Sequence, residues 1–265
     1  MHAFNYHRPA SSKDAVSLSS KNAEGRYLAG GQSLVQAMKL RLSSPTDLID
    51  LGTIKDLAGI KVSGSTVEIG AMTRHADVAA SAEVKKAIPA LAALAAMIGD
   101  RQVRHMGTLG GALANSDPAA DYPAAVLGLG ATITTNKRKI EADKFFIGLY
   151  ETALEPGELI TSVSFPAPKR AAYMKFKNPA SRFAIVGVFV ADFSGKVRVG
   201  VTGAGPSAFR QADMEKALSA KFAPESVANM KVKADGLNND LHASPEYRAH
   251  LVTVMAKRAV EAALK

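Results

Sequence analysis

At 265 residues, with 47% hydrophobic and 22% charged side chains, the chain can bury roughly three quarters of its unfolded surface, which excludes a disordered or fibrous protein. The absence of cysteine excludes disulfides, thiolate nucleophiles and iron–sulfur clusters held by this chain. The formal charge of +9 suits an anionic ligand, but basic residues are dispersed except at residues 137–139, a predicted hairpin tip, so nucleic acid is not an expected partner.

No segment predicts export or a membrane span. Residues 1–10 lack the apolar run of a secretory signal, and no window approaches the roughly 18 apolar residues of a spanning helix. A cytoplasmic protein is therefore expected.

A small β-α-β unit is predicted near the start of the chain. Residues 26–29 read as a strand and the following Gly-Gly-Gln as a turn, with Ser33 as the N-cap of a helix. A Ser-Ser-Pro stretch stops the helix, and residues 47–51 form the second strand. The apolar face of the helix is expected to carry Leu34, Val35, Met38 and Leu42.

Later elements predict an α+β architecture. Residues 60–62 and 66–69 flank a Ser-Gly-Ser turn, which is a hairpin signal, and residues 89–98 form an alanine-rich helix. Several prolines place a domain boundary near residue 170. Beyond it, strands are predicted at residues 173–177, 183–193 and 196–202, with helices at residues 209–218 and 245–264. Strands followed by helices favour α+β over a regular parallel α/β domain.

Two Gly-Gly pairs are candidate anion sites. Gly30 and Gly31 precede a predicted helix start, where unpaired N–H groups and the helix dipole would stabilise a phosphate. Gly110 and Gly111 lie in a second stretch rich in glycine and turn residues. One such pair alone is more often a plain turn with a structural cap. Two Gly-Gly pairs in one chain could together bind the two phosphates of a dinucleotide.

Asp117 before Pro118 is predicted to cap another helix, with proline at its first position. Asp121 would then lie one turn into that helix. Its carboxylate is either solvated there and favourable to the helix dipole, or an acceptor for ligand hydroxyl or ring N–H groups.

Other chemistries find no support. Residues 203–208 superficially match the dinucleotide fingerprint but lack a second parallel strand and the acidic residue that should follow. The six histidines show no metal-ligand spacing, and neither a nucleophile elbow nor a phosphate-binding Walker loop occurs. The chain therefore lacks visible bond-making machinery of its own.

Several segments together resemble the FAD-binding medium subunits of molybdenum hydroxylases, which include the carbon monoxide dehydrogenase medium subunit and the xanthine dehydrogenase flavin domain. They are residues 29–42, 101–111, 117–125, 155–160 and 201–206. Two positions depart from the family pattern. Ala112 stands where many members have asparagine, and Arg182 where others carry aspartate.

The resemblance implies a two-lobed FAD-binding domain of the vanillyl-alcohol oxidase type at residues 1–170, with lobes of about 1–56 and 57–170, and a small α+β domain at residues 171–265. It implies that the glycine loops hold the FAD pyrophosphate non-covalently. Phe183 is either a ring contact or a strand core residue. The implied FAD-binding residues are Ala29, Gly30, Gly31, Gln32, Ser33, Leu34, Thr108, Gly110, Gly111, Ala112, Asp121, Ile160, Lys175 and Phe183.

The resemblance also implies partners and a role. Molybdenum cofactor and [2Fe-2S] clusters are expected only on partner subunits, a large molybdenum subunit and a small iron–sulfur subunit, assembled as a dimer of heterotrimers. This chain would relay electrons through FAD to an acceptor. The rivals are a stand-alone FAD-dependent oxidase or dehydrogenase of the same fold and an anion-binding scaffold without redox function. Substrate and acceptor stay open.

Overall fold

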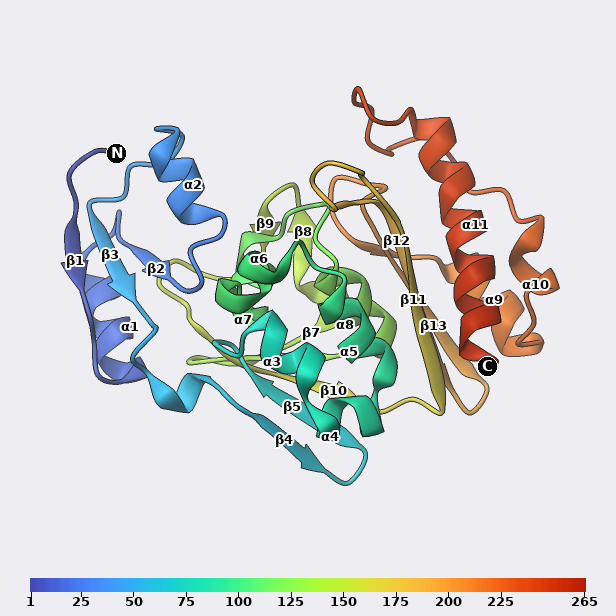
Figure 1. Cartoon of the computed structure of the whole chain (residues 1–265), viewed down its shortest axis with the longest axis horizontal. Helices are drawn as coiled ribbons and strands as arrows, with labels where there is room; N and C mark the ends of the chain where they lie inside the picture. Colours follow the sequence, from blue (N-terminus) through green and yellow to red (C-terminus); the bar gives the residue numbers. More distant parts are fainter.

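The computed structural model describes residues 1–265 and begins with a small parallel sheet (Figure 1). Its strand order is β1-β3-β2, with β1 at Asn5–His7, β2 at Arg26–Leu28 and β3 at Asp47–Asp50. The parallel pairing of β2 with β3 confirms the predicted β-α-β unit. Strand β1 and helix α1 (Ser12–Lys21) lie outside the predicted elements; α1 starts where the Ser11 hydroxyl accepts a hydrogen bond from the N–H of Asp14.

Helix α2 (Leu34–Lys39), which connects β2 to β3, is shorter than predicted. It ends because Arg41 takes a left-handed φ of 60° and the N–H of Leu42 turns back to the carbonyl of Ala37. Leu42 is consequently 79% exposed, so its placement on the apolar face of the helix was wrong. Met38 is the buried residue of α2.

A second, fully antiparallel sheet has the order β4-β5-β10-β6-β7. Its strands are β4 Ile60–Ser63, β5 Thr66–Gly70, β6 Thr132–Thr135, β7 Lys139–Glu141 and β10 Ile160–Pro166. The pairing of β4 with β5 confirms the predicted hairpin. Short elements flank the sheet: the 3-10 turns η1 (Lys55–Leu57) and η2 (Ala142–Lys144), and the hairpin of β8 (Phe146–Gly148) and β9 (Glu151–Thr152).

Six helices between β5 and β6 pack over this sheet (Figure 1). They are α3 His75–Ala80, α4 Ala82–Ala87, α5 Pro89–Ala96, α6 Arg101–Met106, α7 Leu109–Asn115 and α8 Tyr122–Leu129. Helix α5 confirms the predicted alanine-rich helix. Every residue of α8 is buried, which explains why its sequence shows no amphipathic period.

The segment before α8 differs from the prediction. Residues 117–120 form a turn, and α8 begins only at Tyr122. The carboxylate of Asp117 accepts a hydrogen bond of 2.8 Å from the N–H of Ala119. The predicted helix cap at Asp117 was therefore wrong, because an Asp-Pro pair serves equally well in a side-chain-stabilised turn.

The third sheet has the order β11-β12-β13-β14, and its neighbouring strands are antiparallel. The strands are β11 Arg170–Lys177, β12 Ala184–Phe193, β13 Lys196–Thr202 and β14 Phe209–Arg210. Helices α9 (Ala212–Ala220), α10 (Glu225–Ala228) and α11 (Pro245–Ala263) follow, and α11 and α9 cover one face of the sheet. Helix α11 confirms the prediction for residues 245–264. The helix expected at residues 209–218 starts later, since its first two residues pair with β13 as β14.

Helix α8 packs on the other face of the third sheet, and Tyr173, Phe189 and Ala191 of that face belong to the core of the second sheet. Gly200 of β13 permits this contact, because a Cβ atom there would lie 2.2 Å from the carbonyl oxygen of Ala124. The glycine at position 200 therefore decides how closely the two halves of the molecule approach.

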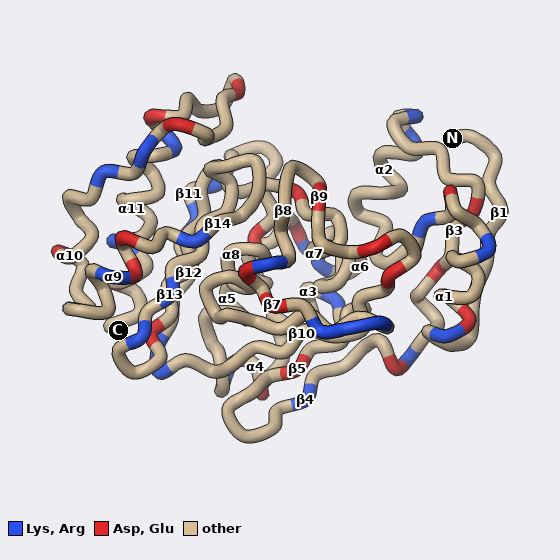
Figure 2. The backbone as a smooth tube through the Cα atoms, turned by 180° about the vertical axis from the view of Figure 1, so that it is seen from behind, with Lys and Arg blue, Asp and Glu red and all other residues tan.

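Charged residues are spread along the chain in short stretches (Figure 2). The longest basic stretch, residues 137–139, lies at the tip between β6 and β7, as predicted. None of the helices is long and apolar enough to cross a membrane.

Candidate functional site

The two glycine pairs, far apart in the sequence, lie against each other. A Cβ atom on Gly30 would fall 2.1 Å from the carbonyl oxygen of Met106 and 2.7 Å from the Cα atom of Gly107. A Cβ atom on Gly111 would lie 3.4 Å from the Cβ atom of Ala29. The first sheet and the helical layer of the second sheet thus meet at these loops, and only glycine at position 30 permits the contact.

The first loop presents an unbroken run of unpaired donors. None of the six backbone N–H groups at residues 29–34 donates a hydrogen bond to an acceptor in the chain. Gly31 has a left-handed φ of 70°, a conformation that lets successive N–H groups converge on one anion. Ser33 stands at the N-cap position of α2, as predicted, but its hydroxyl makes no capping bond to the helix. An anion bound at this loop would therefore be held by backbone donors.

The second loop uses most of its donors internally. The N–H groups of Leu109 and Gly110 bond to the carbonyls of Thr73 and Ala71 at 3.0 and 2.7 Å. The Thr108 hydroxyl caps α7 by accepting a bond of 3.2 Å from the N–H of Gly111. Of these four residues, Thr108 alone keeps its own N–H unpaired. The second loop thus has fewer unpaired backbone N–H groups than the first. It packs against the first loop at Ala29 and Gly30.

Asp121 and Lys175 form a buried ion pair. The Asp121 carboxylate lies 2.9 Å from Lys175 Nζ and accepts a hydrogen bond of 2.5 Å from the Tyr173 hydroxyl. Lys175 Nζ also donates to the carbonyls of Met97 and Arg182, at 2.9 and 3.0 Å. The solvated reading of Asp121 was therefore wrong. Lys175 would have to exchange a partner to bind a ligand directly, because its three donors are already used.

Burial controls the protonation of this cluster. Desolvation raises the pKa of Asp121, while Lys175 and the Tyr173 hydroxyl act in the opposite direction. Burial, followed by the charge of Asp121, raises the pKa of Tyr173 well above its usual value. Tyr173 therefore stays a hydrogen-bond donor. Sequence reasoning placed it only on a strand, because no motif marks the partner of a buried carboxylate.

Phe183 and Ile160 lie in different surroundings. Phe183 is 47% exposed and precedes β12 by one residue, so it is not a strand core residue. It lines a cavity of about 300 Å³ between residues 117–119 and the third sheet, together with Tyr150 and Arg248. Ile160, at the start of β10, has a buried side chain. An exposed aromatic ring beside a cavity can contact a planar ligand.

His75, one of the six histidines without metal-ligand spacing, lies against the second glycine loop at Gly107. Its Nδ1 atom and the Tyr122 hydroxyl are buried without hydrogen-bond partners, and the two rings are 5.3 Å apart. A Cβ atom on Gly107 would fall 2.6 Å from its Nε2 atom. Burial, with a smaller effect of Arg104, lowers the pKa of His75 to about 4.

We expect His75 to make the fold sensitive to mild acid. The folded state keeps His75 neutral down to about pH 4, whereas the unfolded chain protonates it below about pH 6.5. The stability contributed by neutral His75 is therefore present above pH 6.5 and is lost as the pH falls. Urea unfolding should show wild type losing about 2 kcal/mol more than His75→Gln between pH 7 and pH 4.5. Parallel pH profiles of the two proteins would contradict this.

The residues present fit FAD as a ligand. A diphosphate is well bound by several backbone N–H donors, and the N–H groups of residues 29–34 are free to supply them. No cysteine is available for a thioether bond to the flavin, and no cluster of metal-ligating side chains occurs. The arrangement is therefore suited to a non-covalently held dinucleotide.

Comparisons with known proteins agree with this geometry. A family model described as the FAD binding domain in molybdopterin dehydrogenase matches residues 2–168. The chain is 35% identical to the carbon monoxide dehydrogenase medium chain of Hydrogenophaga pseudoflava, over 98% of this chain and 96% of that one. It is also 35% identical to the nicotine 6-hydroxylase medium subunit of Paenarthrobacter nicotinovorans, over 97% and 96% of the two chains.

Solved structures extend the similarity to the whole fold. Reconstituted CO dehydrogenase from Oligotropha carboxidovorans contains a chain that matches with a TM-score of 0.91 and 35% identity, over 99% of this chain and 98% of that one. The resemblance to medium subunits and the α+β fold class are confirmed. The chain therefore belongs to the FAD-binding family of the molybdopterin dehydrogenases, which are oxidoreductases.

Proposed function

We propose that this chain is the electron-transfer subunit of a multi-subunit molybdenum hydroxylase. It would pass electrons from iron–sulfur clusters on a partner, through FAD, to an external acceptor. The observation that carries the proposal is the run of unpaired N–H groups at residues 29–34, held against the second glycine loop. The full-length similarity to medium chains of such enzymes supports it.

The chain's own residues would bind and orient the cofactor. Backbone N–H groups of residues 29–34, helped by Thr108, hold the diphosphate, and Gly111 leaves room for it. The Asp121–Lys175 pair, Ile160 and Phe183 would form the flavin end of the site, and Ala112 would lie near the phosphates. The buried pair and the exposed Phe183 ring beside a cavity support this assignment. FAD supplies the redox chemistry when bound.

The proposed partners are a large subunit with the molybdenum cofactor and a small subunit with [2Fe-2S] clusters, as a dimer of heterotrimers in the cytoplasm. Two observations favour this division of labour. The chain has neither cysteine nor a cluster of metal-ligating side chains, and its relatives are named medium chains. Substrate oxidation would then take place on another chain.

The relay is tested by leaving this subunit out. A complex without it should still reduce its iron–sulfur clusters with substrate but should not reduce the physiological acceptor. Rapid-scanning absorbance separates the two events, and adding back the wild-type chain should restore acceptor reduction. Substrate-dependent bleaching of the flavin in the isolated chain would instead support a stand-alone oxidase or dehydrogenase.

A further inference from the structure

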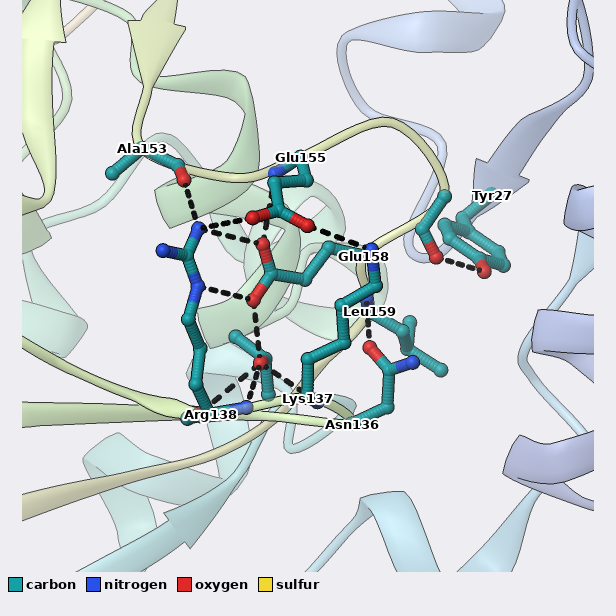
Figure 3. A network of polar contacts seen from close by, with 10 residues as sticks. Tyr27, Asn136, Lys137, Arg138, Ala153, Glu155, Glu158 and Leu159 are labelled. Atoms are coloured by element: carbon teal, nitrogen blue, oxygen red, sulfur yellow. Dashed lines mark hydrogen bonds and ion pairs between the residues drawn. The ribbon is translucent and has the colours of Figure 1, made fainter.

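The Glu158 carboxylate, outside the glycine loops, lies in a network of polar contacts (Figure 3). The Glu158 side chain is 0% exposed. It accepts hydrogen bonds from the Thr135 hydroxyl at 2.7 Å, from Arg138 Nε and a terminal nitrogen at 3.1 Å each, and from the N–H of Glu155 at 2.8 Å. Burial alone would raise the pKa of Glu158, but these bonds lower it to about 2. The group therefore stays ionised at any ordinary pH.

These bonds fix residues 155–159, the segment that leads into β10. Arg138 also donates to the carbonyl of Ala153 at 2.7 Å. Asn136 bonds to both backbone groups of Leu159, accepting from its N–H at 2.8 Å and donating to its carbonyl at 3.0 Å. The β6–β7 tip thus clamps the segment from one side (Figure 3).

Residues 155–160 also contact the first sheet. The Tyr27 hydroxyl of β2 donates to the carbonyl of Gly157 at 2.9 Å. The Leu159 side chain packs in the core of the first sheet with Ile49 and Leu51, whereas Ile160 belongs to the core of the second sheet. Residues 155–160 therefore join the two sheets on whose boundary the glycine loops meet.

We propose that Glu158 is a positioning residue for the FAD site. Tyr27 lies two residues before Ala29, where the phosphate loop starts, and Ile160 lies two residues after Glu158. By fixing the segment between them, Glu158 sets the distance between the phosphate loop and the flavin end of the site. This inference rests on the proposed FAD site and adds a residue that does not touch the cofactor.

A purely structural role is the competing explanation. Buried ion pairs are weak evidence for stability, because desolvation offsets much of their attraction. The two explanations differ in a measurable way. If the segment positions the site, increasing its mobility changes the affinity and reduction potential of the bound flavin. Increasing the mobility of another part of the same sheet leaves both unchanged.

Four variants of the full chain separate the explanations. Glu158→Gln keeps the shape but replaces one acceptor oxygen by a donor, and Tyr27→Phe removes only the bond to Gly157. Lys139→Gln is the matched control beside the same hairpin tip, since the exposed Lys139 side chain makes no hydrogen bond or ion pair with the segment. Ile140→Val weakens the core of the second sheet at β7, a strand that pairs with β6 and not with the segment.

Titration of each apo-protein with FAD, followed by flavin fluorescence, gives the dissociation constant. We expect about tenfold weaker binding for Glu158→Gln and a smaller loss for Tyr27→Phe, with both controls at the wild-type value. The reduction potential of the bound flavin should shift in the first two variants. Faster hydrogen exchange at residues 157–160 should accompany the loss in Glu158→Gln.

Three outcomes would each overturn either the positioning role or the proposed function. If wild type binds FAD and Glu158→Gln binds it equally well, with faster exchange at residues 157–160, the positioning role is excluded. If Glu158→Gln does not fold, Tyr27→Phe with wild-type affinity and potential excludes it equally. If the wild-type chain itself binds no FAD, the proposed function fails instead.

Discussion

Gly111→Val is expected to lower the affinity for FAD at least about a hundredfold, a change of about 2.7 kcal/mol in binding free energy. A Cβ atom at this position would lie 2.9 Å from the Thr108 hydroxyl and 3.4 Å from the Cβ atom of Ala29. The valine branches would therefore enter the space between the two glycine loops, where the diphosphate is proposed to bind. The stability of the fold should fall less than FAD affinity, because the closest contact is with one hydroxyl and Gly111 lies in α7 with an ordinary φ.

The comparison with Gly30→Ala makes this test specific. A Cβ atom on Gly30 would collide with the carbonyl oxygen of Met106, so this variant should lose both stability and FAD binding. Thermal unfolding of the apo-proteins and FAD titration measure the two effects separately. If Gly111→Val unfolds as readily as Gly30→Ala, without selective loss of FAD, Gly111 has only a structural role.

Lys175→Met should destabilise the protein by about 3–5 kcal/mol, because it leaves the Asp121 carboxylate buried without its counter-ion. The side chains of Lys175 and Asp121 are 2% and 4% exposed. Two backbone carbonyls, those of Met97 and Arg182, would lose their donor at the same time. The loss of stability should exceed the loss caused by replacing any exposed lysine with methionine.

Urea unfolding with a matched set of variants checks the result. Lys177→Met, on an exposed side chain of the same strand, should change stability by less than about 0.5 kcal/mol. Adding Asp121→Asn to Lys175→Met should recover part of the lost stability, since the unpaired charge is gone. Equal stability of Lys175→Met and Lys177→Met would show that the buried pair contributes nothing.

Local sequence patterns were sufficient to predict the elements whose turns and helix starts are set by neighbouring residues in the chain. The β4–β5 hairpin follows from two alternating runs around a Ser-Gly-Ser turn, and α5 and α11 each begin with proline in the first turn. The end of α2 was missed because it depends on a left-handed Arg41, a conformation that the sequence does not favour. Asp117 was misassigned because turn and helix cap use the same residues.

The sequence by itself determined that this is an α+β chain of the FAD-binding family, and that two Gly-Gly pairs are available to approach an anion closely. Only the tertiary structure showed that the two loops touch, with Gly30 against Met106 and Gly111 beside Ala29. It also showed that the backbone N–H groups of residues 29–34 stay unpaired. It also enclosed Asp121 and Glu158 with partners from distant segments. The physical reason is that burial and donor satisfaction depend on contacts between residues far apart in the chain, which no local pattern records.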